Sequence, residues 1–146
     1  MSVAIELDHL GGLRVQATHG PSGQTLCSEP PTDNGGSGNA FSPTDLVATA
    51  LGSCVLLMMG MLAERNGLDL SGTRVHVEKH MVTKPLRRIG RLAVTVHIPA
   101  DKAAGLDEAT RDRLERAALH CPVHQSLHPD VEQDIRFEYL TVPALP

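Results

Sequence analysis

The stretch SPTDLVATALGSCVLLMMGMLAERNG, residues 42–67, decides the fold of this chain. Ser42-Pro43 offers a capping hydroxyl followed by proline at the first helical position, and Asp45 stands where a capping-box acid belongs. No charge interrupts residues 46–63, and Asn66-Gly67 supplies a left-handed stop. The pattern predicts one long apolar helix, about 35 Å in length at about 1.5 Å per residue.

A helix that is apolar on every side is buried either in protein or in lipid. The uncharged run is just long enough to form a membrane-spanning helix. However, Thr49, Gly52, Ser53 and Gly60 dilute it, and the remaining sequence is typical of soluble sheet. We therefore expect no membrane association. Because a chain of 146 residues has little material to cover every face of such a helix, the sequence predicts a homodimer.

The segments on both sides of this helix alternate between apolar and polar residues, which predicts strands. The predicted strands are residues 3–7, 13–18 and 24–28 before the helix, and 73–82, 91–98 and 131–140 after it. An amphipathic helix is predicted at 106–120, with a short helical turn at 123–127. The order β-β-β-α-β-β-α-β predicts a single α+β domain over residues 1–146. In it, a curved antiparallel sheet packs against the long buried central helix.

Composition narrows the classes of function. Apolar residues make up 41% of the chain and aromatic residues only 2%, so the core must be aliphatic. A net charge of −4 gives no reason to bind nucleic acid. Residues 1–6 lack the basic start and apolar run of a secretory signal, so we expect a cytoplasmic protein. Three cysteines are too few and too scattered for a disulfide scaffold, but they permit redox chemistry.

Two of the cysteines fall on predicted helices. Cys54 lies near the middle of the long helix, and Cys121 lies at the end of the later helix, because Pro122 disfavours helix at the preceding residue. On its helix position alone, Cys54 is better interpreted as core filling than as a catalytic residue, since free cysteine is among the most buried residue types. Two cysteines on facing elements could instead meet, which requires Cα atoms within about 7 Å. Cys27, beside a predicted loop, is interpreted as structural or incidental.

The motifs around these two cysteines carry a resemblance. Ser42-Pro43-Thr44-Asp45-Leu46 with Leu51-Gly52-Ser53-Cys54 resembles the NPE(Q/E)L…AAC helix of the OsmC/Ohr family, the osmotically inducible protein C and organic hydroperoxide resistance proteins. Cys121-Pro122-Val123 is similar to the second-cysteine motif of that family. The resemblance extends from about residue 13 to residue 139, and the pair of motifs in this order is specific. It implies an OsmC-like fold and an intertwined homodimer with active sites at the subunit interface.

The resemblance also implies thiol-dependent reduction of organic hydroperoxides in oxidative stress defence. The Cys54 thiolate would attack the O–O bond and become a sulfenic acid. Cys121 would then condense with it to a disulfide, and a small dithiol or another thiol reductant would reduce that disulfide. Such a cycle needs no cofactor, neither metal nor haem nor flavin. The many Leu, Val and Met residues suit an apolar substrate pocket.

In this family an arginine beside the reacting cysteine is held by an acid in the first turn of the long helix. Asp45 matches the position of that acid, where the family usually has Glu, although capping explains Asp45 equally well. Residues 32–39, the loop that carries the arginine in one branch, contain none. Arg14, in the second predicted strand, is the best remaining candidate and is equally well explained as a solvent-facing residue. Arg87 and Arg88 are the alternatives.

Two other functions stay open. The missing loop arginine and the Met-rich helix also fit a non-enzymatic module that binds a hydrophobic ligand in the interface cleft, with both cysteines as lining. The spacing of His120, Cys121, His124 and His128 allows a zinc site. Chance clustering near a surface turn is the favoured interpretation of these histidines, because no second ligand pair accompanies them. A histidine near Cys121 could still assist proton transfer during disulfide exchange.

Overall fold

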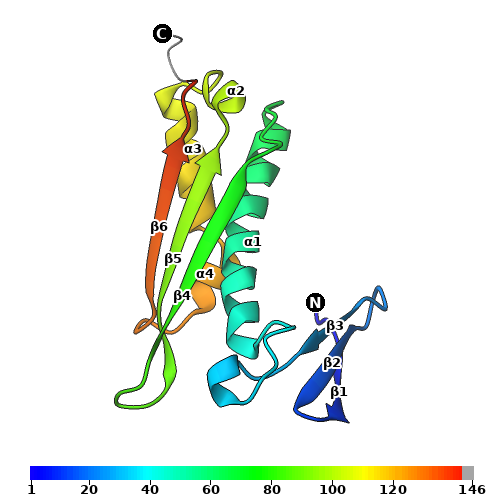
Figure 1. Cartoon of the computed structure of the whole chain (residues 1–146). Helices are drawn as coiled ribbons and strands as arrows, with labels where there is room; N and C mark the ends of the chain where they lie inside the picture. The colour runs from blue at the N-terminus through cyan, green and yellow to red at the C-terminus, as the bar shows by residue number, and fades with distance from the viewer. Residues whose placement is uncertain (143–146) are drawn as a thin grey trace. The chain divides into compact units, whose positions relative to one another are not determined.

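The structure is a computed structural model, and it describes residues 1–142 (Figure 1). The chain divides into two compact units, Met1–Val47 and the part from Ala48 onward. The long helix α1, Pro43–Arg65, begins in the first unit and continues through the second.

The amino-terminal unit is a three-stranded antiparallel sheet in the order β1-β2-β3. The strands are β1 Ile5–Gly11, β2 Arg14–His19 and β3 Thr25–Ser28, followed by a 3₁₀ turn, η1 Thr32–Asn34. These elements confirm the three predicted strands. The described apolar side chains of this unit are all at least partly exposed, and Ile5, Leu7, Leu10 and Leu13 are each more than half exposed. The sheet has no apolar core of its own.

The ends of α1 are as the sequence predicted. The Ser42 backbone N–H donates to Asp45 Oδ2 at 2.8 Å, and the Asp45 N–H donates to Ser42 Oγ at 3.2 Å, which is a reciprocal capping box. At the other end, Gly67 has a left-handed φ of 64°. The Leu68 N–H reaches the Ala63 carbonyl at 2.9 Å, and this bond across the helix end completes a Schellman motif.

The second unit contains the sheet β4-β5-β6, made of β4 Arg74–Val82, β5 Arg88–Ile98 and β6 Glu132–Tyr139. β4 and β5 form the predicted antiparallel hairpin, whereas β6 runs parallel to β5. The α+β class is confirmed, but the expectation of one antiparallel sheet was wrong in two respects. The described residues, 1–142, form two sheets. The helical connection between β5 and β6 brings the chain back to the end at which β5 began, so β6 must run parallel.

Three helices form that connection: α2 Ala100–Ala103, α3 Glu108–Leu119 and α4 Pro122–Ser126. The predicted helix at 106–120 corresponds to α3, whose N-cap Asp107 accepts the Thr110 backbone N–H at 2.8 Å. The predicted turn at 123–127 corresponds to α4.

The core of the second unit lies between the sheet and its helices. Leu92, Val94, Val96 and Ile98 alternate along β5 and are at most 1% exposed, so one face of the strand is sealed. They share a cluster with buried residues of two helices, Leu51, Val55 and Met59 from α1 and Leu114 and Ala118 from α3. This core holds α1 against the sheet and fixes which of its faces turn inward.

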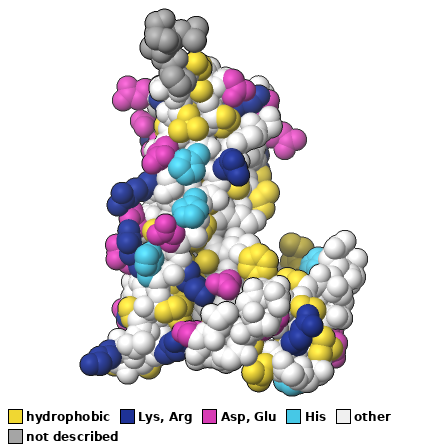
Figure 2. All heavy atoms as spheres, in the orientation of Figure 1, with side chains coloured by type: hydrophobic (Ala, Val, Ile, Leu, Met, Phe, Trp, Pro, Cys, Tyr) yellow, Lys and Arg dark blue, Asp and Glu magenta, His cyan; other side chains and the backbone are white. Residues whose placement is uncertain are grey.

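The other face of this sheet carries charged side chains (Figure 2). Arg91 Nη2 lies 2.6 Å from Asp134 Oδ2, and Arg136 Nη2 lies 2.9 Å from the same oxygen. Hydrogen bonds from Arg136 and then from Arg91 hold the pKa of Asp134 below its usual value. The Arg91–Asp134 pair ties β6 to β5, whereas Arg136 and Asp134 both lie on β6, and together these side chains leave this face polar.

Among the described residues, α1 is the one helix long and apolar enough to cross a membrane. Core helices of soluble proteins share that length and composition, so the observation is weak evidence for a span. The absence of membrane association remains a prediction.

Candidate active site

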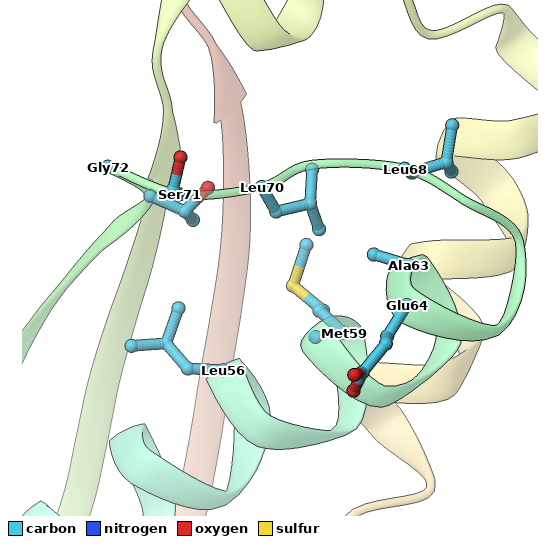
Figure 3. Close-up of a pocket in the computed structure, with 10 residues that line it drawn as sticks. Leu56, Met59, Ala63, Glu64, Leu68, Leu70, Ser71 and Gly72 are labelled. Carbon is cyan, nitrogen blue, oxygen red and sulfur yellow. The ribbon is translucent and has the colours of Figure 1, made fainter.

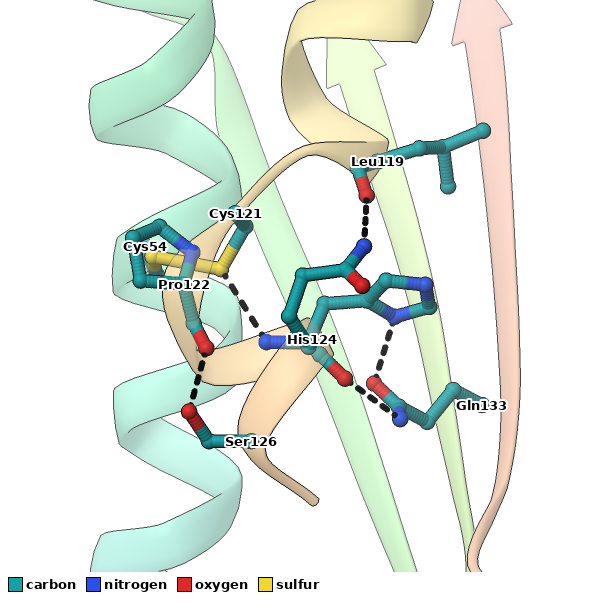
Figure 4. Close-up of a disulfide and its surroundings, with 8 residues drawn as sticks. Cys54, Leu119, Cys121, Pro122, His124, Ser126 and Gln133 are labelled. Atoms are coloured by element: carbon teal, nitrogen blue, oxygen red, sulfur yellow. Dashed lines mark hydrogen bonds between the residues drawn. A yellow bond between two sulfur atoms is a disulfide. The ribbon is translucent and has the colours of Figure 1, made fainter. Parts of the chain in front are cut away.

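The two cysteines singled out by the sequence lie side by side in the second unit. Cys54 on α1 and Cys121 are joined by a disulfide, with Cα atoms 5.8 Å apart (Figure 4). That separation is within the usual range of about 4.4–6.8 Å for disulfide-linked residues. Their sequence separation of 67 is thus bridged by the packing of α3 and α4 against α1. Cys27 is a free cysteine on β3.

Cys54 is placed by the way α1 packs on β4. Leu51 and Val55 are fully buried, and they fix the rotation of the helix so that Cys54 is only half-buried beside the core. Gly52 allows the close approach. A Cβ atom at this position would lie 2.8 Å from Val77 Cγ2 and 3.2 Å from Val75 Cγ1. The absence of a side chain at residue 52 therefore sets the distance between the cysteine-bearing helix and the sheet.

Cys121 is fully buried and forms the N-cap of α4. Its extended ψ of 128° is the conformation that a residue before proline prefers, and Pro122 occupies the first turn of the helix. Cys121 Sγ accepts the backbone N–H of His124 at 3.4 Å. The sequence predicted Cys121 at the end of the preceding helix, but it did not reveal that the sulfur caps the next one.

A pair of polar side chains ties α4 to β6. His124 Nδ1 donates to Gln133 Oε1 at 2.6 Å, and Gln133 Nε2 donates to the His124 carbonyl at 3.1 Å. Figure 4 shows the His124 ring directed toward Gln133 and away from the two sulfur atoms. This orientation does not favour the expectation that His124 transfers protons to the cysteines. Sequence reasoning missed Gln133, because a glutamine in an alternating strand has no distinguishing pattern.

The remaining histidines of the predicted cluster have separate partners. His120 Nδ1 donates to the Arg116 carbonyl at 2.7 Å, and the Asp130 N–H donates to His128 Nδ1 at 3.1 Å. Within residues 1–142, no group of three or more His, Cys, Asp or Glu side chains has an arrangement that could hold a metal ion. The geometry therefore offers no support for the zinc hypothesis.

Arg14 and Asp45, the other predicted site residues, belong to the amino-terminal unit. Arg14 begins β2, and its charge is one of several influences on Glu29, a buried carboxylate that is 7% exposed. Hydrogen bonds from the Ser37 hydroxyl and backbone N–H lower the pKa of Glu29 most, and Arg14 lowers it further. Asp45 forms the capping box described above. Their action on Cys54 remains a prediction.

The alternative arginines lie in the second unit. Arg88 Nη1 donates to the backbone carbonyls of Ile89 at 3.0 Å and Asp130 at 3.1 Å. It thereby joins the starts of the two parallel strands, which is a structural role. Arg87 is exposed in the β4–β5 loop.

An apolar hollow of about 370 Å³ lies between α1 and the segment that leads to β4 (Figure 3). Figure 3 shows Leu56, Met59 and Ala63 of α1 facing Leu70, with Glu64 at its edge. At about 100° per residue, Met59 projects roughly 140° away from Cys54 around the helix. The hollow is therefore on a different side of α1 from the disulfide.

Comparison with known proteins places the chain among relatives. A sequence model of the family described as OsmC-like protein matches residues 36–136. A protein from Psychrobacter arcticus, described as an osmotic stress induced and detoxification response protein, is 36% identical; the match covers 92% of this chain and 94% of that one, with a TM-score of 0.83. No curated protein matches the chain.

Two further solved structures share the fold at lower identity. An organic hydroperoxide resistance protein OsmC from Legionella pneumophila is 18% identical, with 94% of this chain and 97% of that chain covered and a TM-score of 0.72. The organic hydroperoxide resistance protein OhrB of Bacillus subtilis is 14% identical, with 94% and 98% covered and a TM-score of 0.65.

Proposed function

Because the chain belongs to the family of OsmC-like proteins, we propose that it reduces organic hydroperoxides by thiol chemistry and serves in peroxide-related stress defence. The observation that carries the proposal is the pairing of Cys54 with Cys121. A reacting thiol and a resolving thiol must come within bonding distance of each other, and the sulfur atoms of Cys54 and Cys121 meet this requirement. Several solved structures of the same fold are named organic hydroperoxide resistance proteins, which supports the same substrate class.

The proposed cycle has three balanced steps. The Cys54 thiolate attacks the hydroperoxide ROOH; the O–O bond breaks, and with one proton the products are Cys54 sulfenic acid and the alcohol ROH. The Cys121 thiol then attacks the sulfenic sulfur, forming the disulfide and releasing water. Finally, an external dithiol reduces the disulfide by exchange and is itself oxidised. The protein needs no cofactor for any step.

The different burial of the two sulfur-bearing residues suits this division of roles. Cys54 is half-buried, so peroxide and reductant can reach it, whereas Cys121 is fully buried. Exchange therefore begins with thiol attack on Cys54, and Cys121 leaves. The His124 N–H directed at Cys121 Sγ would stabilise the departing thiolate.

Cys54 needs help to ionise. A cysteine of pKa about 8.5 is only about 3% thiolate at pH 7, and apolar surroundings reduce that fraction. Arg14 is our proposed activating cation and Asp45 the acid that orients it. In the proposed homodimer, the Arg14 guanidinium that acts on a given Cys54 belongs either to the same copy or to the partner copy.

We propose that the protein is a cytoplasmic homodimer. The amino-terminal sheet buries no apolar side chain among its described residues, and a three-stranded sheet without a core is not stable alone. Leu57 and Met61, which are 63% and 48% exposed on α1, present further apolar area. A second copy that covered these surfaces would bury the exposed apolar side chains of the amino-terminal sheet and of α1.

The decisive experiment counts thiols in the fully reduced protein before and after one equivalent of cumene hydroperoxide. We expect the loss of two thiols per chain, and we expect Cys54→Ser to abolish that loss. Cys27→Ser is the matched control and should still lose two. If the reduced protein keeps its thiols after treatment, or Cys54→Ser loses as many, the proposed function is wrong.

A second function is favoured by one observation, the apolar hollow beside Met59. Its volume of about 370 Å³ falls within the range of small-ligand pockets, about 300–1,000 Å³. A non-enzymatic module that holds a hydrophobic ligand would use it without needing the cysteines. Native mass spectrometry of the purified protein distinguishes this function: a retained apolar ligand with no thiol loss on peroxide treatment supports it over the enzyme.

A further inference from the structure

The position of Cys121 depends on a helix that is too short to be stable on its own. α4 has five residues, Pro122–Ser126, and Cys121 is its N-cap. Isolated helices shorter than about 12 residues are marginal in water, because forming the first turn fixes several residues for a single hydrogen bond. Contacts outside the helix must therefore keep α4 formed when the disulfide is absent.

The Gln133 side chain supplies such contacts from β6. Its amide makes two hydrogen bonds to one residue, accepting from His124 Nδ1 at 2.6 Å and donating to the His124 carbonyl at 3.1 Å. The carbonyl can only accept, so the amide nitrogen must face it and the amide oxygen must face the ring. His124 Nδ1 is therefore the donor of the hydrogen bond to Gln133 Oε1.

Gln133 is itself firmly placed. It is half-buried and lies opposite Leu92 in the parallel pairing of β6 with β5, and Leu92 is fully buried. His124 connects this anchored strand to the cysteine, because its backbone N–H donates to Cys121 Sγ at 3.4 Å. One residue thus binds β6 through its ring and carbonyl and binds the sulfur through its amide.

We propose that Gln133, acting through His124, is a positioning residue for Cys121. The pair orders α4 in advance and so raises the effective concentration of the Cys121 thiol at Cys54. Within the proposed function, it speeds the step in which Cys54 sulfenic acid and the Cys121 thiol give the disulfide and water. The inference deepens the proposed function at that step, but its effect on disulfide formation does not require peroxide.

The test equilibrates the full-length reduced protein with mixtures of reduced glutathione and glutathione disulfide. Glutathione disulfide oxidises the two thiols and becomes two molecules of glutathione. Gln133→Met removes both hydrogen bonds to His124 at similar side-chain length. We expect the equilibrium constant for forming the Cys54–Cys121 disulfide to fall about tenfold, the order expected for two lost hydrogen bonds. This corresponds to a reduction potential about 30 mV higher.

Gln125→Met is the matched control. Gln125 Nε2 donates to the Leu119 carbonyl at 3.2 Å in an exposed bond that water can replace, whereas the two bonds to Gln133 are part-buried. The variant therefore loses a weak glutamine hydrogen bond of the same short helix and keeps the link to β6. We expect its equilibrium constant to stay within about twofold of the wild type. If Gln133→Met and Gln125→Met give equal constants, the inference is overturned. Should Gln133→Met not fold, Gln133→Asn, whose shorter amide cannot reach both partners, replaces it.

A second readout connects the inference to peroxide. After a pulse of cumene hydroperoxide, dimedone labels sulfenic acid that has not yet been resolved. We expect more label on Cys54 in Gln133→Met than in Gln125→Met. No label in any variant, combined with a shifted glutathione equilibrium, would sink the proposed function and leave the positioning role intact. Label above the untreated background that is equal in the two variants would contradict the positioning role.

Discussion

α1 packs so closely against β4 at Gly52 that a side chain at this position would meet the strand. In Gly52→Ala, the new Cβ would lie 2.8 Å from Val77 Cγ2 and 3.2 Å from Val75 Cγ1. Both neighbours are β-branched and have little rotamer freedom, so relief requires a shift of the helix or the strand. Overpacking of this kind costs about 1–3 kcal/mol. Alanine in place of glycine inside a helix returns about 1 kcal/mol.

The matched control lies on the same helix. A Cβ atom at Gly60 has nothing within 4 Å, so Gly60→Ala should gain about 1 kcal/mol through helix propensity alone. We expect Gly52→Ala to be less stable than Gly60→Ala by about 1–3 kcal/mol. Urea unfolding of the reduced proteins, at one protein concentration, measures this difference. Equal stability of the two variants would refute the close-packing argument.

A double-mutant cycle tests whether Val77 is the cause. Val77→Ala removes the methyl group nearest to the new Cβ, so it should cost less in the Gly52→Ala background than in the wild type. We expect a favourable coupling of about 1–2 kcal/mol between the two sites. Additive effects would show that Gly52 is required for a reason other than contact with Val77.

The remaining predictions address the disulfide, the helix cap and the charged face. Reducing the disulfide, which closes 67 residues, should lower the free energy of unfolding by about 2–4 kcal/mol, measured with and without dithiothreitol; Cys27→Ser should show the same change. Because the reductant is expected to attack Cys54, the Cys121→Ser variant should accumulate a mixed disulfide between Cys54 and a thiol reductant. In the Cys54→Ser variant, peptide mass spectrometry should find much less mixed disulfide on Cys121. Ser42→Ala removes the capping oxygen and should cost about 0.5–2 kcal/mol by urea unfolding, whereas Ser53→Ala, exposed on the same helix, should not. Hydrogen bonds from Arg136 and Arg91 lower the pKa of Asp134 in the folded state, so ionised Asp134 stabilises the fold above about pH 4. This contribution is lost as the pH falls below that value. The free energy of unfolding should therefore decrease less between pH 5 and pH 2 in Asp134→Asn than in the wild type.

Local chemistry explains which features were predictable. The capping box of Ser42 and Asp45, and the left-handed stop at Gly67, are interactions between residues close in sequence, and the structure has them. Alternating patterns located each strand to within a few residues. By contrast, the parallel direction of β6 depends on how three helices return the chain, and no local pattern encodes that.

The candidate site divides in the same way. The motifs around Cys54 and Cys121 were recognisable, because their residue types and order are a property of the sequence. Gln133 was not recognisable, since its role arises from β6 lying beside α4. Nor did the sequence indicate the apolar hollow, because its lining combines residues of α1 with residues of the segment around Leu70.

From its sequence alone, this protein has a long uncharged helix with a defined beginning and end, a set of strands around it, and two cysteines in a recognisable context. These features follow from short-range hydrogen bonding and from the periodicity of apolar residues. Only the tertiary structure decided that Cys54 and Cys121 meet, that a backbone amide points at the buried sulfur, and that Gln133 holds the short helix in place. Such juxtapositions depend on the packing of segments far apart in the chain, where the burial of shared apolar surface sets the distances.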